Sequence, residues 1–170
     1  MYRDAALFTE YWRNARSRTL RVLDHLPEEE LEWSPAPGKF TFGDLYRHLA
    51  GIERYMFAEN AMRRPSVYPG HSEALARGIA DVRSYVQRCH EESLDVFASL
   101  SGEDLSSRCE TPAGRPITVW KWLRSMVEHE AHHRGQLYLM ASMKGIEIEP
   151  LYGLTEEQVA ARSRTAAVSE

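Results

Sequence analysis

The sequence predicts an all-α protein whose architecture is an antiparallel four-helix bundle. Apolar residues recur at helical spacing in four long blocks, and short segments rich in proline, glycine and serine separate these blocks. Four helices of about 20 to 29 residues with short connections are typical of such a bundle, in which binding sites are built from side chains on facing helices. A chain of 170 residues has the length of one domain with a single core.

The first helix is expected between an N-cap at Asp4 and about His25, because Pro27 ends the pattern soon afterwards. The segment 27–39 contains too many prolines for regular structure. The apolar stripe of this helix consists of Leu7, Phe8, Tyr11, Ala15, Val22 and Leu26.

The second helix is expected to begin at the capping-box pattern of Thr41 and Asp44 and to reach about Met62. His48 falls on the inward face of this helix, because that face is marked by the stripe Leu45, Leu49, Ile52 and Met56.

The third helix is expected from a cap at Ser72 to about Leu100, slightly weakened by Gly78. Between Ser101 and Pro116, the sequence Thr111-Pro112-Ala113-Gly114 predicts a turn at the tip of a short hairpin. The apolar positions of the helix are Leu75, Ile79, Val82, Val86, Leu94 and Phe97.

The fourth helix is expected from a cap at Thr118 to Lys144, where Gly145 supplies the left-handed residue that commonly ends a helix. The bundle domain then comprises residues 1–146. Residues 147–170 form a C-terminal tail with the pattern of one further short helix and an end that frays.

Composition and charge exclude several partners. The 21 Lys and Arg residues against 25 Asp and Glu residues include no basic block, so nucleic acid is not expected to bind. No apolar run approaches the roughly 20 residues that span a bilayer, and the N-terminus lacks a signal-peptide pattern, so we expect a cytoplasmic protein without a membrane partner. Cys89 and Cys109 lack the spacing of metal or redox motifs and are expected to be reduced and largely buried.

The fourth helix carries the main functional signal. His129 and His133 are four residues apart, so they share one helix face. That face is the inward stripe, whose other members are Val119, Trp122, Met126, Leu137 and Met140. Together with His48, these residues supply three inward imidazoles, which is the ligand count of a catalytic zinc or nickel site with open positions.

A packing role is the alternative for each of these histidines. A single core histidine is more often a hydrogen-bonded packing residue, and this reading is favoured for His48 alone. For His129 and His133 a metal is favoured, because two desolvated imidazoles each need a partner. His132 is offset from their stripe, so it is a candidate for proton transfer, for a hydrogen bond at the pocket edge, or for a solvent-exposed position. Surface or capping positions are expected for His25, His71 and His90.

The run also fits the H-E-x-x-H pattern of zinc proteases, in which Glu130 would act as general base in a zinc hydrolase that uses His129 and His133. Gly135 comes one residue too early for the H-x-x-G-x-x-H extension, and the chain offers no convincing substrate-binding sheet. This reading is the less favoured one.

Two runs of the sequence stand out together. They are the second-helix run Thr41-Phe42-Gly43-Asp44-Leu45 continuing through His48, and the run His129-Glu130-Ala131-His132-His133-Arg134-Gly135-Gln136-Leu137. Both resemble motifs of the DinB-like/YfiT-like superfamily of bacterial metalloenzymes. The likeness covers residues 1 to 146 and implies an antiparallel four-helix bundle with a divalent metal, often zinc or nickel, held by His48, His129 and His133. It also implies that His132 is not a ligand and that Glu130 is not a protease base.

The same resemblance implies an activity class. Family members with known activity are thiol-dependent transferases or isomerases that activate a low-molecular-weight thiol such as bacillithiol or mycothiol, while many members have no assigned reaction. We therefore expect a small-molecule electrophile as substrate, with a non-enzymatic metal-binding stress-response protein as the alternative. Members are frequently homodimers, and a dimer is permitted here by aromatic residues expected at the surface: Trp12, Tyr55, Trp120 and Tyr152.

Other polar residues near the site carry weaker expectations. Glu53 is rotated off the face of His48, so a surface position or support of a ligand is expected. Glu130 and Arg134 have the spacing of a helix salt bridge, and Gln136 can hydrogen-bond the outer ring nitrogen of a ligand histidine. Core positions are expected for Tyr46 and Tyr138.

Overall fold

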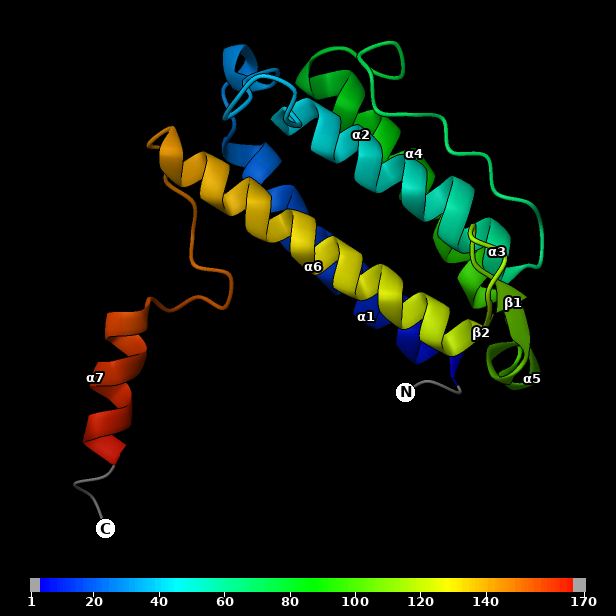
Figure 1. The fold of residues 1–170 in the computed structure, drawn as a ribbon. Coiled ribbons are helices and arrows are strands. Elements are labelled where there is room, and N and C mark those ends of the chain that lie inside the picture. Colours follow the sequence, from blue (N-terminus) through cyan, green and yellow to red (C-terminus); the bar gives the residue numbers. More distant parts are fainter. Residues whose placement is uncertain (1–3, 167–170) are drawn as a thin grey trace.

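The computed structural model describes residues 4–166 and is mostly helical, with one small two-stranded sheet (Figure 1). In chain order its elements are α1 (Ala5–His25), the short 3-10 helix η1 (Glu28–Glu30), α2 (Phe42–Ile52), the π-helical segment η2 (Glu53–Ala58), α3 (Glu59–Ala61), α4 (Gly78–Ala98), α5 (Gly102–Ser106), β1 (Arg108–Glu110), β2 (Pro116–Thr118), α6 (Val119–Met143) and α7 (Glu156–Ala166).

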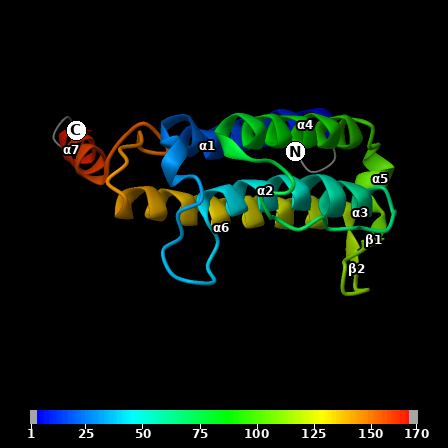
Figure 2. The ribbon, with the colours of Figure 1, turned by 90° about the horizontal axis from the view of Figure 1, so that it is seen from above.

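Four long helical segments enclose the core. The segments α2, η2 and α3 follow one another without a break and form the second long helix, with a π-helical interruption that the periodicity did not reveal. Helices α1 and α4 lie in one layer, and α2 and α6 lie in the other (Figure 2). Contacts join α1 to both α4 and α6, and join α2 to the same two helices, so buried side chains from all four segments meet between the layers.

The local start signals of the first two helices are confirmed. Asp4 caps α1, since its Oδ1 accepts from the backbone N–H groups of Ala6 and Leu7. The Thr41 hydroxyl and Asp44 carboxylate form the predicted capping box of α2. In the apolar stripe predicted for α1, the position of Leu7 is wrong, because its side chain is 50% exposed.

The prediction for α4 is wrong at its start, which lies at Gly78 rather than after Ser72. Gly78 has a φ of +78°, a left-handed conformation, so the α-helix cannot extend past it toward the N-terminus. One N–H group of the first turn is capped from another segment, because both carboxylate oxygens of Glu28 accept from the N–H of Ile79, at 3.1 and 3.2 Å. The loop before α4 is held by a hydrogen bond from the Arg47 guanidinium to the carbonyl of Ala76, at 3.0 Å.

Substitution of Gly78 by alanine is expected to lower the free energy of unfolding by about 1–2 kcal/mol, the cost of a Cβ in the left-handed region. The new Cβ would also approach Oε1 of Glu28 to 2.7 Å. Gly135→Ala is the matched control, because its Cβ meets nothing within 4 Å inside α6, and it should gain about 0.5–1 kcal/mol. Urea unfolding of both variants tests the pair, and equal effects would contradict the account.

The hairpin and the fourth helix are confirmed. Strands β1 and β2 pair antiparallel, with Cys109 opposite Ile117, and Gly114 in the predicted turn has a φ of +70°. Helix α6 follows Thr118 and ends before Gly145, whose φ is +68°. The cap expected from Thr118 is wrong in one respect, because its hydroxyl makes no capping hydrogen bond.

The tail contains one helix, α7, which lies apart from the other helices in Figures 1 and 2. The last four residues, for which fraying was expected, lie outside the described residues. Within residues 4–166, no helix is both long and apolar enough to cross a membrane.

Of the four aromatic residues expected at the surface, Trp12 is not exposed. Trp12 is fully buried in the core, while Tyr55 and Trp120 are half-buried and Tyr152 is exposed. Both cysteines are free and buried, as predicted.

Candidate metal centre

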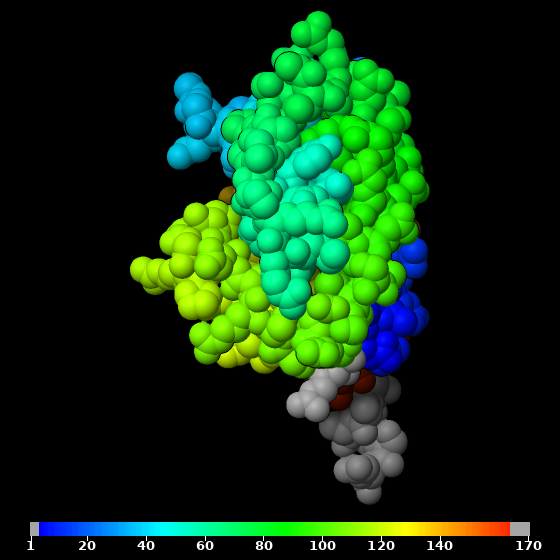
Figure 3. Space-filling view, turned by 90° about the vertical axis from the view of Figure 1, so that its right-hand side faces the viewer, coloured from blue at the N-terminus to red at the C-terminus, as the bar shows by residue number. Residues whose placement is uncertain are grey.

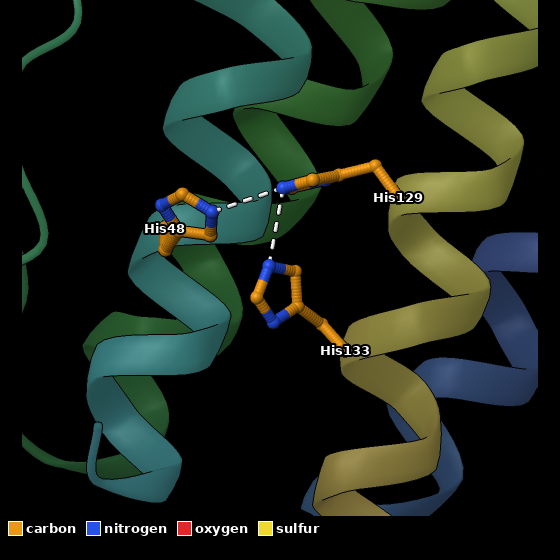
Figure 4. A group of neighbouring side chains, drawn as sticks. All are labelled: His48, His129 and His133. Atoms are coloured by element: carbon orange, nitrogen blue, oxygen red, sulfur yellow. Dashed lines mark hydrogen bonds between the residues drawn. The ribbon is translucent and has the colours of Figure 1, made fainter. Parts of the chain in front are cut away.

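Three histidines from two adjacent helices converge on one point in the seam between α2 and α6 (Figure 4). His48 comes from α2, and His129 and His133 come from successive turns of α6. The Nε2 atom of His129 lies 3.1 Å from Nε2 of His48 and 3.1 Å from Nε2 of His133. The structure thus brings together the three residues that the sequence predicts as ligands.

The outer ring nitrogens of two of these histidines are held by other side chains. Nδ1 of His133 lies 2.7 Å from Oε1 of Gln136. An amide oxygen only accepts, so Nδ1 carries the proton and Nε2 presents its lone pair to the cluster. This confirms the hydrogen bond expected for Gln136.

Tyr68 holds the second ligand ring and was missed by the sequence analysis. Its hydroxyl lies 2.8 Å from Nδ1 of His48 and 3.3 Å from Nδ1 of His71. If Nδ1–H of His48 donates to Tyr68 and the Tyr68 hydroxyl donates to His71, Nε2 of His48 also presents a lone pair. Tyr68 lies in a loop without periodicity, and no motif marked it.

Burial keeps these imidazoles neutral. Desolvation, followed by the neighbouring His133 and His71 rings, lowers the pKa of His48 to about 4. Desolvation and the other imidazoles lower the pKa of His129 to about 3, and desolvation also lowers the pKa of His133. The three rings are therefore in their metal-binding form at neutral pH.

The donor set fits a divalent metal ion. Ideal tetrahedral zinc with Zn–N bonds of about 2.0–2.1 Å places its nitrogen ligands roughly 3.3 Å apart. Two of the Nε2 separations are 3.1 Å, and the ligand atoms of all three histidines lie within 4.8 Å of one another. Neutral imidazoles suit both zinc and nickel. Among the described residues the group contains three ligand residues, which is the number in catalytic sites that keep an open position.

Metal retention should be nearly constant from about pH 8 to about pH 6 and should fall only in more acidic solution. Protons compete with the metal for the Nε2 lone pairs, and pKa values of about 4 for His48 and about 3 for His129 move this competition below the ordinary histidine range. Equilibrium dialysis at stepwise pH, followed by elemental analysis, measures the curve. A midpoint at the ordinary histidine pKa would contradict it.

Gln136→Leu should weaken metal binding about 10- to 100-fold, because the His133 ring loses the partner that fixes its tautomer and orientation. Gln136→Glu keeps an acceptor and should retain most of the affinity. Gln87→Leu, at an exposed position of α4, is the matched control. Competition with a chromogenic chelator measures all three, and wild-type affinity in Gln136→Leu would show that the hydrogen bond does not support the centre.

The remaining histidines occupy different positions. His132 is exposed, and its Nε2 lies 3.3 Å from the Gln136 amide nitrogen, at the rim of the cluster. His25 is exposed, as expected. The surface positions expected for His71 and His90 are wrong: both are half-buried, and Nδ1 of His90 lies 2.8 Å from Oε1 of Glu53.

A buried charged cluster lies between the two layers, and it corrects two expectations. Glu53 is buried rather than exposed, and its carboxylate accepts from the Arg16 guanidinium and from Nε1 of Trp12. Glu130 is buried as well and pairs with Arg16 at 3.3 Å, whereas Arg134 donates to the carbonyl of Ala15 at 3.4 Å. The cluster joins α1 to the two helices that carry the histidines.

The two carboxylates share one guanidinium unequally. Burial by itself raises the pKa of Glu53, but the charge of Arg16 and the His90 hydrogen bond outweigh it, so the pKa lies below its ordinary value. For Glu130, burial outweighs Arg16 and the pKa is raised. Glu53 is thus the principal counter-ion of Arg16.

This cluster also bears on the hydrolase alternative. Glu130 follows His129 directly, so the two side chains leave α6 in different directions. His129 meets His48 of α2, while Glu130 meets Arg16 of α1. The carboxylate is therefore not placed to act as a base on a nucleophile at the histidine cluster.

Two cavities lie near the ends of the α2/α6 layer. The larger, of about 640 Å³, lies between the end of α3 and the hairpin, and no histidine lines it. The smaller, of about 400 Å³, is not lined by a histidine either, but Phe40 and Gln136, which contact the ligand histidines, are among its lining residues. Phe40 stacks on His48 with ring centroids 5.4 Å apart, so the smaller cavity adjoins the metal centre.

Comparisons with known proteins find the same fold and a family. A DinB-like protein from Bacillus cereus ATCC 10987 has a TM-score of 0.74 at 19% identity, covering 88% of this chain and 99% of that chain. The DinB-like protein YjoA from Bacillus subtilis has a TM-score of 0.67 at 18% identity, covering 86% of this chain and 97% of that chain. These likenesses show a shared fold, and no curated protein matches the sequence. The DinB superfamily model matches residues 11–137, most of the chain, and this protein therefore belongs to the DinB superfamily.

Proposed function

We propose that this protein is a divalent-metal-dependent enzyme, with zinc or nickel in the three-histidine site, that transfers a low-molecular-weight thiol to a small electrophile or isomerises such a molecule through the thiol. The observation that carries the proposal is the convergence of three neutral Nε2 atoms from His48, His129 and His133. A bound divalent ion lowers the pKa of a coordinated thiol or water and so supplies a nucleophile near neutral pH.

The residues of the chain have distinct tasks in this proposal. The three imidazoles hold the ion, and Tyr68 and Gln136 keep two of the rings in the required tautomer. Phe40 covers one side of the cluster and limits the access of water. His132, at the exposed rim, is the side chain that can accept the proton released by the thiol.

The wider setting follows the family resemblance. We interpret the four long helical segments as an antiparallel four-helix bundle that holds the two histidine-bearing helices in register. We further propose a homodimer with a cytoplasmic location, for which the size of the oligomer in solution is the first test.

The proposal is tested by conjugation of small thiols, bacillithiol and mycothiol among them, to the fluorogenic electrophile monochlorobimane. Zinc- or nickel-loaded protein should accelerate conjugation, and chelation or His129→Ala should remove the acceleration. His132→Gln should lower the rate with metal content unchanged. If metal-loaded protein accelerates none of the thiols, and chelation only lowers the melting temperature, the non-enzymatic metal-binding alternative is favoured.

A further inference from the structure

We propose that the 400 Å³ cavity beside the histidine cluster binds the apolar body of the substrate, so that this protein acts on molecules with an alkyl or aryl group close to the reacting atom. The inference rests on the proposed function, because it assigns a substrate class to the same site. The cavity has the size of small-molecule sites in proteins. Its apolar walls are Pro35, Phe40, Leu45, Leu139, Met140 and Met143.

The cavity lies next to the histidine cluster along the axes of α2 and α6. Leu45 precedes His48 by three residues on α2, and Gln136 follows His133 by three residues on α6. These two helices run in opposite directions (Figure 1), so both residues lie on the same side of the cluster. At 1.5 Å per residue the axial offset is about 4.5 Å, so the nearest lining residues lie within about one helical turn of the ligand histidines.

Two side chains belong to both the cavity and the cluster. Phe40 lines the cavity and contacts the rings of His48 and His133, with centroids 5.4 and 6.2 Å apart. Gln136 lines the cavity and holds Nδ1 of His133. A molecule in the cavity would therefore touch residues that contact the ligand histidines.

The outer wall is formed by the loop of residues 33–40, which stands out from the surface in light blue in Figure 3. Across from this loop, Leu139 and Met143 of α6 are 62% and 56% exposed. Large exposed apolar side chains gathered in one place are typical of ligand-binding grooves and of protein interfaces, and here they line a cavity. The polar side chains of the lining are Lys39, in the exposed loop, and Gln136, whose amide oxygen is already bonded to Nδ1 of His133. The other lining residues are apolar, so an alkyl or aryl group is the ligand class that they fit.

Two metal-chelating hydroxamates with different chain lengths test the proposal without requiring turnover. Acetohydroxamate and hexanohydroxamate share a head group, so both should bind the cobalt-substituted protein through the metal, as followed by the visible spectrum. Hexanohydroxamate should bind about tenfold more tightly or better, since a fully buried CH₂ is worth about fourfold in affinity. Leu139→Asp should remove this gain and leave acetohydroxamate binding unchanged.

Leu7→Asp is the matched control, because Leu7 is a half-exposed leucine in the first turn of α1 and does not line the cavity. It should keep the chain-length gain. Equal affinities of the two hydroxamates in wild type would overturn the cavity assignment. An unchanged gain in Leu139→Asp would overturn it as well. If that variant also shifted from dimer to monomer, the face would be assigned to a second copy of the chain.

The outcomes separate the two proposals. Binding of neither hydroxamate to the cobalt-loaded protein would mean that the metal has no coordination position open to a ligand, and both proposals would fall. A clear chain-length gain in a protein that conjugates no thiol would uphold the apolar site and overturn the thiol reaction.

Discussion

His129→Ala is expected to lower the affinity for zinc or nickel by about a hundredfold or more and to abolish metal-dependent conjugation. The Nε2 atom of His129 is the one that lies 3.1 Å from both other Nε2 atoms, so its removal leaves two imidazoles that no longer share a common neighbour. Metal-competition titration and conjugation rates measure the two losses.

His25→Ala is the matched control for this prediction. His25 is exposed, and its Nδ1 lies 2.8 Å from the carbonyl oxygen of Arg21 in its own helix, so its loss should leave metal binding unchanged. Circular dichroism should show equal helix content in both variants. A His129→Ala protein that binds metal like wild type would contradict the assignment of the centre.

Arg16→Met is expected to lower the free energy of unfolding by about 3–5 kcal/mol, the range measured when one partner of a buried ion pair is removed. The substitution leaves Glu53 and Glu130 buried together without their shared cation. Without Arg16 both carboxyl groups gain protons on folding, so the loss should be largest at neutral pH and should shrink in acid. Urea unfolding at neutral and acidic pH measures both effects.

Arg83→Met supplies the comparison for an exposed pair. Arg83 lies 2.7 Å from Asp24, and both side chains reach solvent, so this loss should be less than about 1 kcal/mol. The triple variant Arg16→Met, Glu53→Gln, Glu130→Gln should recover part of the lost stability, because it buries no unpaired charge. If Arg16→Met costs no more than Arg83→Met, the buried cluster is not a stabilising element.

Much of the fold could be predicted because its signals are local. The Thr41 and Asp44 capping box, the 111–114 turn and the stop at Gly145 each depend on residues within a few positions. The helical face of His129 and His133 follows from a spacing of four in the same way.

The missed features depend on contacts between distant segments. Glu53 binds Arg16 and His90, each more than 30 residues away, so neither its burial nor that of Trp12 beside it could be read from a helical stripe. The late start of α4 depends on Glu28, and Tyr68 reaches His48 from a loop. Helical periodicity describes one element at a time and contains no information on such partners.

Elemental analysis of untagged protein tests the central claim most directly, with wild type beside the double variant His48→Ala, His133→Ala. Near-stoichiometric zinc or nickel in wild type and none in the variant is the predicted result, because the variant keeps only one of the three converging Nε2 atoms. Wild-type protein that holds no metal even after reconstitution would contradict the account, and the histidines would then be packing residues of the α2/α6 seam.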